Sequence, residues 1–128
     1  MSSARQGEVW FVDLEPTRGR EQAGRHPAVA VSVDQLGGGP SELVIVVPLT
    51  RIDHGQRLHV AIDPPNGGVR ERSYAMPEMV RSISRDRLVD RWGAIDDATL
   101  AEIARRVRLL VRDPTLSVLG GQTGSCPE

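Results

Sequence analysis

A polar loop between two apolar segments contains residue types that bind anions and transfer protons. The first apolar segment covers residues 7–14, and the second, AVAVSV, begins directly after Pro27. The polar residues of the loop are Arg18, Arg20, Glu21, Gln22, Arg25 and His26. A guanidinium group binds phosphate through a planar fork of donors, and an imidazole exchanges protons near neutral pH. The loop can therefore present cations and a proton-transfer group to an anion.

Composition narrows the kinds of protein that this chain can be. Its 128 residues are typical of one domain, and 39% hydrophobic and 26% charged residues are ordinary for a soluble globular protein. The formal net charge of −1 means that any nucleic-acid site has to be a local positive patch. The single cysteine, Cys126, excludes an intrachain disulfide and a cysteine-based zinc site. We find no pattern of a signal peptide or a membrane-spanning segment, so we expect a cytoplasmic protein.

Short strands followed by one helix are the elements that must position the loop. Runs rich in Val, Ile, Leu and aromatic residues, separated by turns, predict the strands. The expected strands cover residues 7–14, 28–33, 43–49, 58–62, 73–83 and 88–94, with a short helical turn near 84–87. Apolar residues at helical spacing predict a helix over 97–112, which Asp96 caps and Pro114 ends. This order indicates an antiparallel α+β fold, and residues 113–128 are predicted to be a disordered tail.

Three segments, in register along the chain, resemble those of one protein family. GEVWFVDLEPTRGREQAGRHP at residues 7–27 is similar to the opening of the MazF/PemK (Kid-like) toxins, whose pattern is roughly G-E-(I/V)-W-x-(V/A)-(D/S)-L-x-P-x-x-G-x-E-Q-x-G-x-R-P. The likeness continues at VVPLT (46–50) and at MVRSISRDRLVDRWGAIDDATLAEI (79–103). It covers residues 6–112 of the chain.

This resemblance implies a fold, an activity and partners. The family's fold is a small SH3-like antiparallel β-barrel of the CcdB/PemK type with a C-terminal helix, which residues 1–112 would form as one domain of a homodimer. Its members are toxins of type II toxin–antitoxin systems, endoribonucleases (mRNA interferases) that cut single-stranded RNA at specific sequences and are neutralised by a MazE-like antitoxin. We expect no cofactor, because no cluster of His and carboxylate residues has metal-ligand spacing. Cleavage without a metal needs a base for the 2′-OH, cations for the phosphate and an acid for the leaving 5′-oxygen.

The sequence departs from the family pattern at the position of the working Arg. The family has this Arg immediately before the Pro that ends the loop, whereas here His26 precedes Pro27 and Arg25 lies one residue earlier. Adjacent residues of an extended segment point in opposite directions, so Arg25 need not reach the place of the family's Arg. Three alternatives remain open. His26 does the work, the loop shifts so that Arg25 serves, or the activity is weakened or lost.

Position in the family pattern also assigns roles to Thr50 and Glu78. Thr50 matches a strand-end Thr or Ser whose hydroxyl can donate to a phosphate oxygen, although such a hydroxyl can also simply close a turn. Glu78 matches a catalytic Asp or Glu that would act as a base or orient the Arg, and the alternative is a surface salt bridge. One branch of the family has an Arg at the position of Met76 and a His at that of Arg20, so we do not expect its mechanism here. The predicted catalytic residues are Arg25, His26, Thr50 and Glu78, and the predicted RNA-binding residues are Arg18, Arg20, Glu21, Gln22 and Arg81.

Aromatic residues are few, at 3% of the chain. At least one of Trp10 and Phe11 must face the core, since neighbours in a strand alternate. We therefore expect RNA to be recognised through hydrogen bonds and Arg stacking more than through aromatic platforms. His54 and His59 are expected to be surface or structural residues.

Two other functions use similar folds. The CcdB toxins poison DNA gyrase through a C-terminal segment that contains Trp, but this chain has no Trp after Trp92. A non-catalytic SH3-like module would need an aromatic groove for Pro-rich peptides, and the chain has one Tyr and one Phe. We therefore predict an endoribonuclease toxin, with a catalytically weakened toxin that binds a protein target such as gyrase as the alternative.

Overall fold

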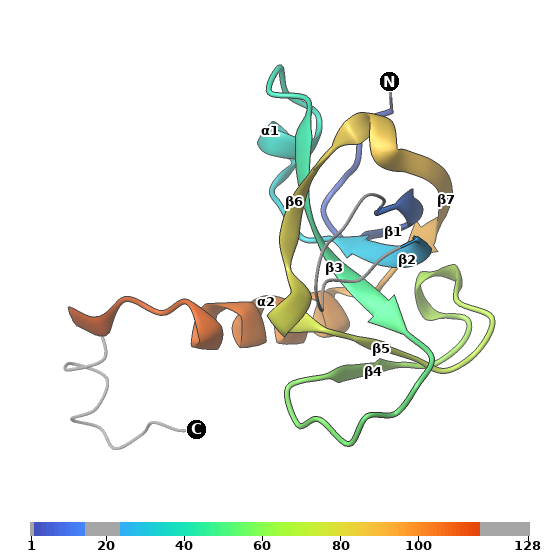
Figure 1. Ribbon diagram of the computed structural model, residues 1–128, viewed down its shortest axis with the longest axis vertical. Coiled ribbons are helices and arrows are strands. Elements are labelled where there is room, and N and C mark those ends of the chain that lie inside the picture. The colour runs from blue at the N-terminus through green and yellow to red at the C-terminus, as the bar shows by residue number, and fades with distance from the viewer. Residues whose placement is uncertain (1, 15–23, 116–128) are drawn as a thin grey trace.

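The computed structural model describes residues 2–14 and 24–115 and shows an antiparallel sheet with one long helix beside it (Figure 1). The strands are β1 (Glu8–Asp13), β2 (Arg25–Ala30), β3 (Leu43–Thr50), β4 (Val60–Ile62), β5 (Ser73–Ala75), β6 (Arg81–Ser84) and β7 (Leu88–Ala94). The helices are α1 (Asp34–Gly37) and α2 (Asp97–Leu110), with 3-10 turns η1 (Asn66–Gly68), η2 (Pro77–Met79) and η3 (Arg85–Arg87). These elements confirm the expected α+β fold. The predicted tail lies outside the described residues from residue 116 onward.

The sheet is organised around β3. The strands pair in the order β4-β5-β3-β2-β1-β7, and β6 also pairs with β3. β3 therefore contacts three antiparallel neighbours, β2, β5 and β6, as its continuous apolar run predicts for a central strand. Among the described strands the path is open at β4 and at β7, so the expected barrel is only a loose description of this sheet.

Two hydrophobic clusters cover the two faces of the central strands. Strand residues alternate between faces, so Ala28 joins the cluster that contains Trp10 and Val12, whereas its neighbour Val29 joins the cluster that contains Val9. Trp10 is 8% exposed, which confirms that one residue of the Trp10–Phe11 pair faces the core. The same alternation, continued along β2 and β3, sets the direction of the polar residues at the strand ends.

Helix α2 has the predicted start and an amphipathic face. The carboxylate of Asp96 accepts a hydrogen bond from the backbone N–H of Thr99 at 2.8 Å, which caps the helix. Ile103 is fully buried in the cluster that contains Val9, and Leu100 and Val107 pack against it. In Figure 1 the C-terminal end of α2 extends beyond the strands. None of the helices in the described part of the chain is long and apolar enough to cross a membrane.

Several expected boundaries were wrong. β4 is shorter than the expected strand over residues 58–62, and η2 divides the expected strand over residues 73–83 into β5 and β6. β2 begins at Arg25 rather than at residue 28, because its pairing with β1 continues through Pro27 to Asp13. The short helix α1 occupies residues 34–37, for which the sequence analysis predicted no helix or strand. Arg25 and His26 are therefore held in a strand rather than in a loop, which fixes where their side chains point.

Candidate functional site

A groove of about 770 Å³ opens where β1, β2, β3 and β7 meet the turns around them. Its lining includes three of the four predicted catalytic residues, Arg25, His26 and Thr50. Arg51 and Arg70 add positive charge, and Glu71 and Asp90 add negative charge. The lining therefore carries three guanidinium groups against two carboxylates, a small excess of positive charge on a chain of net charge −1.

Arg25 and His26 leave opposite faces of β2. Arg25 pairs with Asp13 across the β1–β2 ladder, and its Nε lies 3.9 Å from the carboxylate of Asp13. His26 pairs with Val12, which belongs to the buried cluster on the other face. Cross-strand partners share a face of the sheet, so Arg25 lies on the face of Asp13 and His26 on the face of Val12. Both side chains line the groove at the end of β2.

His26 and Thr50 extend the same face of the sheet. The β2–β3 ladder pairs Ala28 with Pro48, and His26 and Thr50 each lie two residues further toward the groove. Residues two apart in a strand point the same way. His26, at the position of the family's Arg, thus lies on the same face as Thr50, and both residues line the groove.

The hydroxyl of Thr50 already makes one turn contact. Its Oγ1 accepts a hydrogen bond from the backbone N–H of Ile52 at 3.2 Å, as the simple structural alternative predicted. A hydroxyl has one donor in addition to its acceptor lone pairs. This contact therefore orients Thr50 without using its proton, which can still be donated to an oxygen of a ligand.

Most of the other groove residues were not predicted as site residues, and among them are Phe11, Arg51, Arg70 and Trp92. The rings of Phe11 and Trp92 stack with centroids 5.8 Å apart and planes 7° from parallel. Arg51 forms an ion pair with Glu71 at 3.0 Å. The sequence predicted that both aromatic residues lie in strands. The β1–β7 register that brings the two rings together cannot be obtained from the local sequence pattern.

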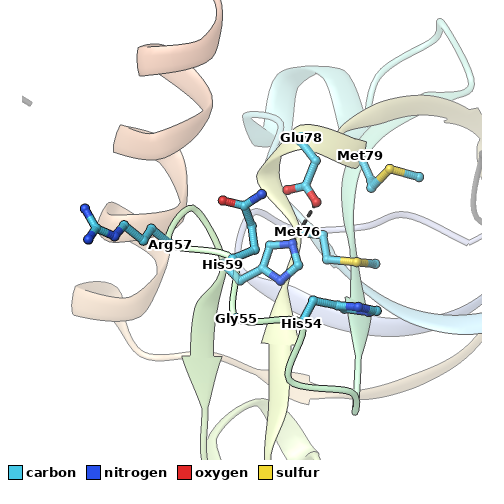
Figure 2. A pocket seen from close by; sticks show the side chains of 8 residues that line it. His54, Gly55, Arg57, His59, Met76, Glu78 and Met79 are labelled. Atoms are coloured by element: carbon cyan, nitrogen blue, oxygen red, sulfur yellow. Dashed lines mark hydrogen bonds and ion pairs between the residues drawn. The ribbon is translucent and has the colours of Figure 1, made fainter.

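Glu78 lies in a second pocket, of about 610 Å³, and does not line the groove (Figure 2). Figure 2 shows the imidazole of His59 pointing toward the Glu78 carboxylate, and Nε2 lies 2.7 Å from Oε2. The side chain of His59 is only 5% exposed, so it is not a surface residue. His54 packs edge-on against it, with ring centroids 5.9 Å apart. The structure therefore pairs Glu78 with a histidine rather than with Arg25.

Helix α2 anchors the loop that joins the groove to this second pocket. Nη1 of Arg106 donates to the carbonyl oxygens of Arg57 and His59 at 2.7 and 2.8 Å. Nε of Arg106 donates to the carboxylate of Glu102 at 2.6 Å. Hydrogen bonds from Arg105 and from Arg106 lower the pKa of Glu102 from 4.5 to about 2. The loop that follows Thr50 is thus fixed by backbone contacts to a charged pair on α2.

The predicted RNA-binding residues are only partly placed. Arg81 is half-buried in β6 opposite Val46 and is not among the residues that line the groove. Its Nη1 is buried and has no hydrogen-bond partner among the described residues. The other four predicted contacts, Arg18, Arg20, Glu21 and Gln22, lie outside the described residues.

Comparison with known proteins gives one consistent family. The profile described as "PemK-like, MazF-like toxin of type II toxin-antitoxin system" matches residues 5–111. The chain is 34% identical over 110 residues to Endoribonuclease MazF9 of Mycobacterium tuberculosis, covering 82% of this chain and 93% of that protein. It is 30% identical over 107 residues to Endoribonuclease EndoA of Bacillus subtilis, covering 82% of this chain and 91% of that protein.

Solved structures show the same fold. MazF from Deinococcus radiodurans superposes with a TM-score of 0.77 at 22% identity, covering 87% of this chain and 98% of that one. A mycobacterial endoribonuclease in complex with its cognate antitoxin superposes with a TM-score of 0.69 at 22% identity, covering 89% of this chain and 98% of that one. The chain belongs to the PemK-like, MazF-like toxin family of type II toxin–antitoxin systems.

Proposed function

We propose that this chain is the toxin of a type II toxin–antitoxin system and an endoribonuclease that cleaves single-stranded RNA in the groove of Arg25, His26 and Thr50. The observation that carries the proposal is the placement of a proton-transfer group, a hydroxyl donor and a guanidinium around one groove. Relatives named as endoribonucleases, at 34% and 30% identity over most of their length, support the same reaction.

The proposed reaction is attack of the RNA's own 2′-oxygen on the neighbouring phosphorus. His26 accepts the proton of the 2′-OH as the O2′–P bond forms, since histidine exchanges protons near neutral pH. The P–O5′ bond breaks, the leaving 5′-oxygen takes a proton from water in the open groove, and the hydroxide that remains takes the proton held by His26. The products are a 2′,3′-cyclic phosphate and a 5′-OH end. Neither a metal nor an external nucleophile enters this balance.

Thr50 and Arg25 stabilise the negative charge that grows on the phosphate. The Thr50 hydroxyl shares the face of His26 and donates to a non-bridging oxygen, and Arg25 supplies positive charge from the other face of β2. We assign Glu78 to holding His59 in the second pocket, because it contacts His59 and does not line the groove. The resemblance gave Glu78 a catalytic role, and that role would need a path to the groove through the loop between Thr50 and His59.

The proposed partners follow from the same groove. An antitoxin segment with acidic residues, folding as it binds, would occupy the sites of the RNA phosphates. A MazE–MazF complex and a mycobacterial toxin with its cognate antitoxin are solved examples in similar folds. We propose that this chain has such an antitoxin, forms a homodimer and acts in the cytoplasm, where messenger RNA is found. Gyrase binding, the alternative function, has no support from the named relatives.

Incubation with a long single-stranded RNA in EDTA tests the proposal. Cleavage at a recurring short sequence, with 5′-OH ends that accept phosphate from polynucleotide kinase, is the expected result. Intact RNA after incubation with the folded protein, or cleavage that disappears with EDTA, would contradict it. Arg108→Gln provides the control, since Arg108 is exposed on α2 and does not line the groove.

A further inference from the structure

We infer that the stacked rings of Phe11 and Trp92 are a platform for one nucleobase of the RNA, next to the phosphate that Arg25 contacts. This inference rests on the proposed function for the identity of the ligand. It goes beyond that function because it assigns an aromatic subsite where the small aromatic content of the chain predicted none.

The two rings come from neighbouring strands and share one face. Phe11 in β1 lies opposite Asp90 in β7, and the register of the two strands shifts at Trp92, between Arg91 and Gly93. The ring of Trp92 stacks on that of Phe11, so the two rings share a face despite this shift. The ring planes are 7° from parallel and the centroids 5.8 Å apart, an offset stack. β7 is the last strand of the path among the described residues, which leaves Trp92 at the border of the sheet.

Exposure distinguishes this pair from the aromatic core. Trp92 is 38% exposed, whereas Trp10, which lies two residues before Val12 on the other face, is 8% exposed. The exposed surface of Trp92 lies in the groove, where a ligand or partner can cover it, and this position favours a binding role. The flat face of a base is the ligand that best matches a flat, partly exposed aromatic surface.

The charges around the platform favour a nucleotide over an apolar peptide. Phe11 also pairs across β1–β2 with Pro27, two residues from Arg25, so Arg25 and the platform lie on the same face. Arg70 lines the same groove and is exposed. A single-stranded nucleic acid can contact the rings and the guanidinium groups at once, with a base on the rings and its phosphates on the guanidinium groups.

Binding of short oligonucleotides that cannot be cleaved tests the platform separately from the reaction. The probes are a pool of randomised 2′-O-methyl RNA, which lacks the attacking 2′-OH, and an abasic tetrahydrofuran phosphodiester of equal length. We expect the protein to prefer the base-bearing pool by roughly 5- to 150-fold, which corresponds to about 1–3 kcal/mol of stacking. Trp92→Ala should lose this part of the preference, and Trp92→Phe, which keeps a ring, should retain it.

Tryptophan fluorescence gives a second readout, because Trp92 and the buried Trp10 are the two tryptophans of the chain. The base-bearing pool should quench the wild type, the abasic probe should not, and Trp92→Phe should lose the quenching while it still binds. Val89→Ala is the matched control, since Val89 is an exposed apolar residue of β7 that does not line the groove.

A Trp92→Ala protein with native circular dichroism that prefers the base-bearing pool as strongly as the wild type would overturn the inference. If sedimentation also showed weaker self-association of that variant, Trp92 would be a subunit contact. A wild type that prefers base-bearing probes but leaves RNA intact would support the platform and contradict the proposed cleavage, so the two claims fail separately.

Discussion

His26 in β2 and Thr50 in β3 lie on the same face of the sheet, each two residues beyond the paired Ala28 and Pro48. Arg25 lies on the opposite face, opposite Asp13. The register therefore puts His26, and not the displaced Arg25, on the face of the strand-end hydroxyl. Of the three alternatives left by the sequence, this geometry favours His26 as the group that moves the proton.

Removal of the Thr50 hydroxyl should slow cleavage without weakening RNA binding much. Thr50→Val removes a donor to the phosphate, and loss of one such donor costs roughly 10²–10³-fold in rate. Thr50→Ser keeps the hydroxyl and should retain most of the activity. Single-turnover cleavage of one RNA measures the rate. The midpoint of denaturant unfolding measures any loss of stability from the missing turn contact to Ile52, so the two effects can be separated. Equal rates for the Val and Ser variants would remove Thr50 from the mechanism.

Arg70 should contribute through charge alone. Because it lines the groove, Arg70→Gln should lower the affinity for single-stranded RNA similarly for all sequences and reduce the salt dependence, log K against log salt, by about 0.7. Arg108→Gln on α2 should leave the slope unchanged. Fluorescence anisotropy over a salt series measures both. An unchanged slope for Arg70→Gln would place the RNA path elsewhere.

Glu78 should matter for stability and little for cleavage. Glu78→Ala leaves Nε2 of the buried His59 without its partner, which should cost about 1–3 kcal/mol of unfolding free energy. Glu78→Gln keeps an acceptor oxygen and should recover part of that loss. Urea unfolding and cleavage rates, measured on the same samples, show whether Glu78 contributes to stability or to cleavage. A folded Glu78→Gln protein that has lost cleavage would restore the catalytic role that the resemblance implied.

The Glu102 carboxylate should make stability depend on pH in the acid range. Its pKa is about 2 in the folded protein against an ordinary 4.5, because of hydrogen bonds from Arg105 and Arg106. A lowered pKa stabilises the folded state fully above the ordinary value, and the contribution is lost as pH falls from 4.5 toward 2. The difference in melting temperature between wild type and Glu102→Gln should therefore be largest near neutral pH and should disappear in acid.

Asp63→Asn is the control for Glu102→Gln. It breaks an exposed ion pair with Arg72, in which the Arg72 and Asp63 side chains are 57% and 61% exposed, and should change the melting temperature little. If the difference in melting temperature between wild type and Glu102→Gln were the same at all pH values, Glu102 would stabilise the protein through packing rather than through its charge.

Local sequence predicted the parts of the fold that depend on local chemistry. The apolar run of β3, the cap at Asp96 and the strand-end position of Thr50 all follow from residue type and spacing. The extension of β2 through Pro27 does not, because it depends on pairing with β1. A proline ordinarily weakens a strand prediction, and only the partner strand shows that the ladder continues past it.

The site residues that were missed depend on contacts between distant parts of the chain. Phe11 and Trp92 meet only through the register of β1 and β7, and Glu78 meets His59 only through the folding of the loop after Thr50. Residue counts gave a low aromatic content, but two well-placed rings are enough for one platform. Spacing along the chain therefore identified the strand-end groups and could not identify their neighbours.

The most direct test of the account compares His26→Ala and Arg25→Ala with the wild type in single-turnover cleavage of one RNA in EDTA. We predict that His26→Ala loses roughly 10²–10⁴-fold in the cleavage rate at saturating protein, as expected for a proton-transfer group. Arg25→Ala should bind RNA more weakly, with a shallower salt dependence of binding because one phosphate contact is lost, and should keep more of its rate at saturation. A His26→Ala protein that cleaves as fast as the wild type would contradict the central claim.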